Sequence, residues 1–272
     1  MPLPEWAILK LLKILSILSL GLMALGQTPR PVARPLPGRL LVALDPGHGG
    51  EDEGARGHGG LLEKSVSLEL ADLLAAQLRK AGMEVLLTRD DDTYIPLWDR
   101  ARAANAAGAD IFISLHLNAY PTRQAKGSEV YFLSMGAGDR LAAELAAVEN
   151  AGNQPRAELD PDAVVADILN DMSQKAFLQE SERLAVAIQG QLNLLGGIKE
   201  RGVKQAPFVV LRGAAMPAVL VETAFISNPR EEAKLRDPEF RVRVAQAITK
   251  GVRRFFAGGT GVARRQTGLG PR

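Results

Sequence analysis

Short apolar runs that alternate with helical patterns most constrain how this chain can fold. The runs span residues 40–44, 84–88, 110–115, 128–133, 208–211 and 218–221. Several of them are continuous rather than alternating, which is typical of strands that are covered on both faces. Helical periodicity lies between or after them, at residues 63–81, 97–107, 139–149, about 163–195 and 238–256. The pattern predicts one α/β domain over residues 39–257, with a mostly parallel or mixed twisted sheet of about six strands and helices on both faces.

The first 26 residues predict an export signal. Lys10 and Lys13 precede an uncharged apolar run, residues 14–25, which ends in small residues next to Gly26. This order of basic, apolar and small-residue regions is typical of a secretory signal peptide, and the apolar run is too short for a comfortable membrane span. We expect cleavage after Gly26, with an uncleaved amino-terminal anchor as the alternative. The protein is then exported to the periplasm or cell envelope, with no stable transmembrane span.

The segments that flank the predicted domain carry the basic charge of the chain. Residues 27–38 form a Pro/Arg-rich linker, and residues 258–272 form a Gly/Arg-rich tail that we expect to be disordered. Residues 39–257 have a net charge of −4, although the whole chain has a net charge of +2. This distribution and the export signal disfavour a nucleic-acid partner. The chain has no cysteine, which excludes thiol nucleophiles, disulfides and cysteine-based metal sites.

Four polar residues follow or precede the predicted elements where a ligand would bind. His48 follows the first strand, Glu63 opens the next helix, and His116 and Glu222 end two later strands. Open α/β sheets bind ligands beyond the carboxyl ends of their strands. Two histidines and one carboxylate are the ligand set of a catalytic zinc, and a second carboxylate can accept a proton and pass it on. The set predicts a metal-assisted hydrolase.

Each of these residues also has a simpler structural interpretation. His116 could be a hydrogen-bonded core histidine, and Glu63 could favour the positive end of its helix. Glu222 is harder to explain in this way, because an unpaired carboxylate at a buried strand end is costly. His58 lies in a Gly-rich turn and is interpreted as a solvated loop residue. The sequence contains no contiguous zinc motif, serine nucleophile elbow or phosphate-binding glycine loop.

Several short stretches run in a recognisable order over residues 39–256. They are LDPGHGG at 44–50, LEK at 62–64, LTR at 87–89, SLHLNA at 114–119, GSEVY at 127–131, RGVKQA at 201–206, MPAVLVE at 216–222 and FISNP at 225–229. In this order they resemble the zinc-dependent N-acetylmuramoyl-L-alanine amidases of the Amidase_3 family, of the AmiA/AmiB/AmiC type. Leu117 and Thr223-Ala224 depart from the family pattern beside the site, without removing a matched functional residue.

The resemblance implies hydrolysis of the amide bond between N-acetylmuramic acid and the L-alanine of the stem peptide in peptidoglycan. The biological role would be cell-wall turnover or daughter-cell separation. By position, His48, Glu63 and His116 match the ligands of one zinc ion, and Glu222 matches the catalytic glutamate. The alternatives are a catalytically inert wall-binding protein and a zinc peptidase that acts on stem peptides.

An insertion at about residues 150–176 resembles the regulatory helix of some family members. It carries an apolar stripe at positions 164, 165, 168, 169 and 172. In those relatives the helix plugs the zinc cleft until a LytM-type activator protein displaces it. The resemblance implies autoinhibition, with Glu149 or Glu158 as an additional, inhibitory metal ligand. The alternative is an ordinary amphipathic helix that packs on the core.

Overall fold

The computed structural model describes residues 39–134, 136–151 and 161–258, with only the helical backbone for residues 161–176. The predicted signal peptide, the linker, Glu158 and residues 259–272 of the tail lie outside the described residues. Within the described part of the chain, no helix has the length and apolarity needed to cross a membrane.

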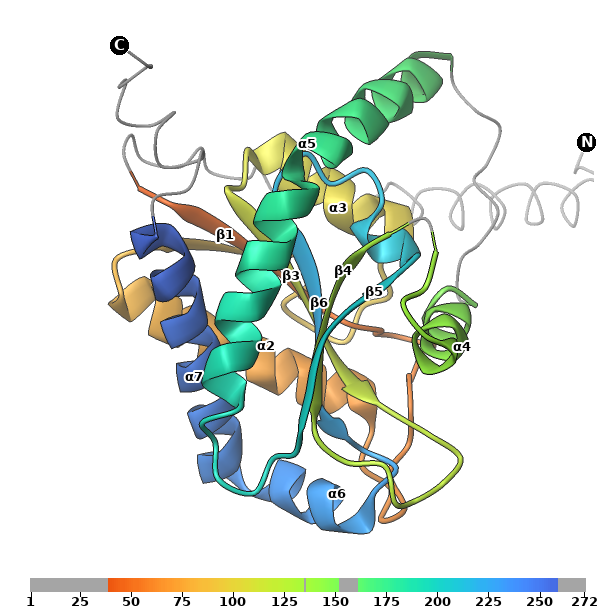
Figure 1. Cartoon of the computed structure of the whole chain (residues 1–272), viewed down its shortest axis with the longest axis vertical. Helices are drawn as coiled ribbons and strands as arrows, with labels where there is room; N and C mark the ends of the chain where they lie inside the picture. Colours follow the sequence, from red (N-terminus) through yellow and green to blue (C-terminus); the bar gives the residue numbers. More distant parts are fainter. Residues whose placement is uncertain (1–38, 135, 152–160, 259–272) are drawn as a thin grey trace, which may run out of the picture. The chain divides into compact units, whose positions relative to one another are not determined.

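Six strands form one mixed sheet in the order β2-β1-β3-β6-β4-β5 (Figure 1). Their bounds are β1 (Leu41–Pro46), β2 (Glu84–Leu87), β3 (Ile111–Asn118), β4 (Ser128–Leu133), β5 (Glu200–Ala206) and β6 (Ala218–Phe225). Neighbouring strands are parallel except β4 and β6, which pair in antiparallel orientation. The predicted α/β class with a mixed sheet is therefore confirmed.

Helices cover both faces of the sheet, as predicted. They are α2 (Glu63–Lys80), α3 (Leu97–Ala107), α4 (Arg140–Glu149), α5 (Pro161–Leu192), α6 (Pro229–Arg236) and α7 (Pro238–Ala257), with a short 3-10 helix η1 (Val209–Leu211). The side chains of α2, α5 and α7 pack on one face, and those of α3, α4 and η1 pack on the other. Helix α5 is continuous from Pro161, so the second half of the predicted insertion is the first part of this helix.

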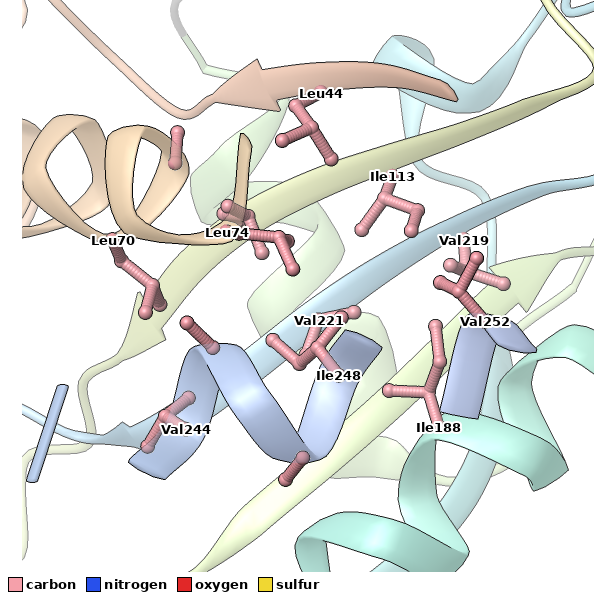
Figure 2. Packing of buried hydrophobic residues seen from close by; sticks show 14 of the residues in the cluster. Leu44, Leu70, Leu74, Ile113, Ile188, Val219, Val221, Val244, Ile248 and Val252 are labelled. Atoms are coloured by element: carbon pink, nitrogen blue, oxygen red, sulfur yellow. The ribbon is translucent and has the colours of Figure 1, made fainter. Parts of the chain in front are cut away.

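Branched aliphatic side chains fill the layer between the sheet and α2, α5 and α7 (Figure 2). The strands contribute Leu44, Ile113, Val219 and Val221, and the helices contribute Leu70, Leu74, Ile188, Val244, Ile248 and Val252. All of these side chains are buried. The central strands could be predicted from their continuous apolar runs, because both of their faces are covered.

Close contact between α5 and α7 depends on Gly251. A Cβ atom at this position would lie 2.6 Å from the Ile188 Cα, a backbone atom that cannot rotate away. We expect Gly251→Ala to lower the free energy of unfolding by about 1–3 kcal/mol, because the two helices must separate. Gly190, on α5, is the control: a Cβ there meets no atom within 4 Å, so Gly190→Ala should raise the same free energy by up to about 1 kcal/mol. Urea unfolding measures both, and equal effects would contradict the packing argument.

Two elements differ from the sequence prediction. The apolar run at residues 208–211 is not a strand but contains η1, which is buried against the α3 side of the sheet. The Asn150 side chain holds this segment by accepting a hydrogen bond from Val209 N and donating one to Pro207 O. The strand that was not predicted is β5. Its polar sequence ERGVKQA lacks an apolar run because β5 is an edge strand, which among the described residues pairs with β4 alone.

Helix α6 was also not predicted. It has eight residues and a largely charged sequence, so it offers little apolar periodicity. Its start is nevertheless well defined, because the Asn228 side chain accepts hydrogen bonds from Arg230 N and Glu231 N, and Pro229 occupies the first helical position.

Candidate metal centre

The pleat of the strands directs the polar side chains toward the α3 and α4 side of the sheet. Successive side chains of a strand point to opposite faces. Leu115 and Leu117 belong to the core under α2, α5 and α7, so His116 between them points the other way. Glu222 lies opposite His116 in the β3–β6 pair, and Glu129 lies opposite Glu222 in the β4–β6 pair. Three neighbouring strands thus present one polar residue each at the same place.

Four side chains converge there on one point. Ligand atoms of His48, Glu63, His116 and Glu149 all lie within 4.8 Å of one another. The Nδ1 atom of His116 lies 3.1 Å from an oxygen of Glu63 and 3.0 Å from an oxygen of Glu149. The Nε2 atom of His48 lies 3.2 and 3.4 Å from the same two oxygens. The structure therefore brings His48, Glu63 and His116 together with Glu149, one of the two residues named from the resemblance as an additional ligand.

The donor chemistry of this cluster fits one metal ion. The Nε2 atom of His48 is buried and makes no hydrogen bond to the described residues, although it lies 3.2 Å from an oxygen of Glu63 and 3.4 Å from an oxygen of Glu149. The two imidazoles and two carboxylates offer nitrogen and oxygen ligands, which suit a borderline divalent cation.

The four groups also shift one another's pKa values. Burial alone would lower the pKa of His116, but the carboxylates of Glu149 and Glu63 outweigh burial and raise this pKa to about 10. The pKa of His48 is raised in the same way, against burial, by Glu63, Asp52 and Glu149. Burial would raise the pKa of Glu63, yet the two histidines hold it below its usual range. His116 and His48 also hold the pKa of Glu149 below its usual range, against burial. The two charged carboxylates thus face two imidazoles, and a bound cation would take over the positive charge and leave the imidazoles neutral.

Two buried arginines, Arg89 and Arg100, hold the turn that carries His48; we call them the arginine cradle. Arg100 donates hydrogen bonds to the carbonyl oxygens of Pro46 and His48 at 2.8 and 2.9 Å, and Arg89 donates one to Gly47 O at 2.7 Å. The cradle fixes a strained backbone, since His48 has a positive φ of 60°. The ring of His48 is oriented by Asp52, whose Oδ2 lies 2.9 Å from Nδ1.

Glycine at position 47 permits the two histidines to approach each other. A Cβ at Gly47 would lie 2.5 Å from the His116 ring, and the rings of His48 and His116 are only 4.9 Å apart. Any side chain at position 47 would displace His116, so this glycine is required by the site rather than by its own backbone conformation.

Glu63 is positioned by backbone hydrogen bonds on both of its oxygens. One accepts from Leu117 N and the other from Ala55 N, each at 2.8 Å. The loop before it is held by α6, because Glu232 accepts hydrogen bonds from Gly59 N and Leu61 N. Glu63 is thus fixed by β3 and by its own loop, whereas Glu149 ends the surface helix α4.

The cavity around His48, His116 and Glu149 has a volume of only about 10 Å³, enough for about one water molecule.

Glu222 lies beside the cluster and is completely buried. Neither of its oxygens has a hydrogen-bond partner among the described residues. Burial raises its pKa well above the ordinary value; His116 opposes the shift, and the carboxylates of Glu149, Glu63 and Glu129 add to it. A titratable group kept without partners at such a place is typical of a functional site. His58, in contrast, is exposed and outside the cluster.

The comparisons with known proteins point to one family. The Amidase_3 family, described as N-acetylmuramoyl-L-alanine amidase, matches residues 42–254. AmiA of Escherichia coli (strain K12) is 38% identical over 230 residues, which are 84% of this chain and 80% of that protein. AmiC of Neisseria meningitidis serogroup B is 39% identical over 239 residues, 86% of this chain and 57% of that protein.

Solved structures extend the likeness to the fold. AmiC2 of Nostoc punctiforme has a TM-score of 0.61 and 31% identity, and the match covers 81% of this chain and 98% of that one. An N-acetylmuramoyl-L-alanine amidase from Clostridium difficile 630 gives a TM-score of 0.62 at 29% identity, over 82% of this chain and 99% of that one. The chain belongs to the Amidase_3 family of N-acetylmuramoyl-L-alanine amidases.

Proposed function

We propose that this protein hydrolyses the amide bond between N-acetylmuramic acid and the L-alanine of peptidoglycan stem peptides. The observation that carries the proposal is the convergence of two histidines and two carboxylates within 4.8 Å, beside the buried and unpartnered Glu222. Family membership supports amide hydrolysis in the cell wall, rather than a structural metal, as the role of this arrangement.

Zinc is the metal that we propose for His48, Glu63 and His116. Catalytic zinc sites use three protein ligands of this kind and keep a fourth position open. Magnesium and calcium prefer sites built from oxygen ligands alone, and two imidazoles argue against both. When bound, zinc would polarise the amide carbonyl and lower the pKa of a water molecule.

Glu222 would act as the base and then as the acid of the reaction. It lies opposite His116 across the β3–β6 pair, and its two oxygens are not occupied by hydrogen bonds within the described residues. It would accept a proton from the attacking water and donate one to the nitrogen of the departing alanine. The products are a free lactyl carboxyl group on the sugar and a stem peptide with a new amino terminus.

Glu149 would keep this site closed until α4 moves. Its carboxylate is 3.0 Å from the Nδ1 atom of His116, so it would take a coordination position that a substrate carbonyl or water could otherwise occupy. We infer that Glu149 is an inhibitory fourth ligand, and that the insertion at residues 150–176 belongs to the lid. A LytM-type activator protein would open the site by displacing this segment.

Glu149→Gln should therefore raise hydrolysis of peptidoglycan by about tenfold or more, because the closed state loses a charged ligand contact. The measurement is the rate of peptide release by the full chain without any activator. Glu239→Gln is the matched control, since Glu239 is 88% exposed on α7, and its rate should equal that of the wild type. Unchanged or lower activity in a folded Glu149→Gln protein would reject the lid.

The proposed activity requires that the protein is exported. Residues 1–26 would act as the signal peptide, and the substrate lies in the periplasm or cell envelope. An uncleaved anchor at the same residues would serve the same purpose.

The decisive test uses peptidoglycan, the zinc-loaded protein and its Glu149→Gln variant, with and without a zinc chelator. Chelator-sensitive release of peptides that begin with L-alanine is the expected result. Release with a different new amino terminus would favour the peptidase alternative. If neither protein releases peptide, the chain is an inert wall-binding protein and the proposed function is wrong.

A further inference from the structure

A pocket of about 420 Å³ lies on the β4 and β5 side of the metal centre. Helix α4 forms one wall through Leu145 and Val148, and Asn118, Arg201 and Phe225 form part of the rest. Figure 1 shows α4 beside β4 and β5, with the loop between β3 and β4 below them. The pocket is thus large enough for several residues of a peptide, in contrast to the small cavity around the metal ligands.

The pocket adjoins the proposed catalytic carboxylate. Its lining residue Glu129 lies directly opposite Glu222 in the β4–β6 register, and Asn118 is two residues beyond His116 on β3. Helix α4 borders both spaces, because Glu149 lines the metal cavity and Val148 lines the pocket. A substrate whose amide lies at Glu222 can therefore extend into this pocket.

Arg201 is a cation in the pocket wall that is held in place and has unused hydrogen-bond donors. Its Nε atom is hydrogen bonded to Glu129, and its guanidinium lies 5.0 Å from the centre of the Phe225 ring. Among the described residues, its two terminal nitrogens have no hydrogen-bond partner, and the side chain is 19% exposed.

Glu129 is itself fully engaged, and this engagement fixes Arg201 in place. The carboxylate also accepts hydrogen bonds from Asn118 and Tyr131, and it lies 3.1 Å from the Lys204 Nζ atom. Lys204 makes a second ion pair with Asp139 at 3.1 Å. Of these two cations, Arg201 is the one whose terminal donors remain open toward a ligand, and an arginine with open donors suits a carboxylate.

The charge of the substrate indicates which part of it would bind at Arg201. On the sugar side of the scissile bond the lactyl carboxyl is consumed in the amide, so that side is neutral. On the peptide side, the residue after L-alanine is D-glutamate, which is joined through its γ-carboxyl and keeps a free α-carboxylate. This is the free carboxylate nearest to the scissile bond.

We propose that the pocket binds the stem peptide and that Arg201 binds the α-carboxylate of its second residue. The proposal rests on the proposed function, because it takes Glu222 as the point at which the amide lies. The pocket is open with α4 in the position described, so peptide binding does not require α4 to move.

The test is a titration of the zinc-loaded full chain with two peptides that differ at one group. One is L-alanyl-γ-D-glutamyl-L-lysine, and the other carries D-isoglutamine, in which the α-carboxylate is an amide. The proteins are the wild type, Arg201→Gln, and Arg243→Gln as the control, since Arg243 is half-exposed on α7.

The wild type and Arg243→Gln should bind the carboxylate peptide about tenfold more tightly than the amide peptide, because a charge-assisted bidentate contact is lost with the amide. Arg201→Gln should bind the two peptides equally. The ratio of the two peptide affinities is measured on the wild type alone, so it tests the subsite even if Arg201→Gln does not fold.

Equal affinity of the wild type for the two peptides, or no binding of either, would overturn the subsite. Weakening of both peptides by the same factor in Arg201→Gln would overturn the role of Arg201. Peptidoglycan hydrolysis by a protein that fails this titration would leave the proposed function intact. Absence of hydrolysis by the Glu149→Gln protein would instead overturn the function itself.

Discussion

Replacement of Glu222 by glutamine is expected to lower the rate of peptide release by about 10²–10⁴-fold, the range typical of losing a general acid–base group. Glutamine has nearly the same shape but cannot accept and return a proton. The fold should be retained, because Glu222 makes no hydrogen bond to the described residues that the substitution could break. A buried carboxyl group without partners is costly, so the melting temperature should stay equal or rise.

Three measurements separate this outcome from a general loss of structure. Peptide release gives the rate, thermal unfolding gives the stability, and zinc content shows whether the ligands remain in place. The same substitution at exposed Glu239 should change none of them. Loss of zinc or a lower melting temperature in Glu222→Gln, together with lost activity, would argue that Glu222 supports the structure rather than the reaction.

Replacement of Arg100 by methionine should destabilise the protein by about 3–5 kcal/mol, the range found when one partner of a buried ion pair is removed. Arg100 is 1% exposed and pairs with fully buried Asp45 at 2.9 Å. Burial would raise the pKa of Asp45, but Arg100 and two hydroxyl donors hold it below its usual range, so the aspartate stays charged and would lose its cation. The carbonyl oxygen of His48 would also lose a donor, which should weaken zinc binding.

A neighbouring arginine on the same helix provides the control. Arg102 is 60% exposed and pairs with Asp99 on the surface, so Arg102→Met should cost no more than about 1 kcal/mol. Urea unfolding measures both variants, and Asp45→Asn combined with Arg100→Met should recover part of the loss. Similar destabilisation by the two single substitutions would contradict the importance of the buried pair.

The positions of His48, His116 and Glu222 were predictable because parallel strands bring their carboxyl ends to one edge. His48 follows β1, and His116 and Glu222 lie in the last residues of β3 and β6, which continue to Asn118 and Phe225. Glu129 and Arg201 were not predicted, for a physical reason. Strand β4 runs antiparallel to β6 and β5 follows the direction of β4, so the first residues of these strands, rather than the last, lie at the site.

Burial of the arginines was a part that sequence could not predict. In the Ala-rich helix α3, Arg100 and Arg102 look alike, yet one is buried and the other exposed. The difference arises from Asp45, which lies 55 positions from Arg100 in the chain. Glu149 likewise was singled out only by resemblance, because its contacts with two histidines depend on how α4 packs on the sheet.

The position of α4 between the metal cavity and the large pocket has a thermodynamic consequence. One helix borders both spaces, so a ligand that shifts it on one side changes the free energy of binding on the other. By linkage, the factor by which an occupied pocket alters zinc affinity must equal the factor by which zinc alters affinity for the pocket's ligand. Measuring either quantity would give the other, and a factor of one would mean that the helix stays still.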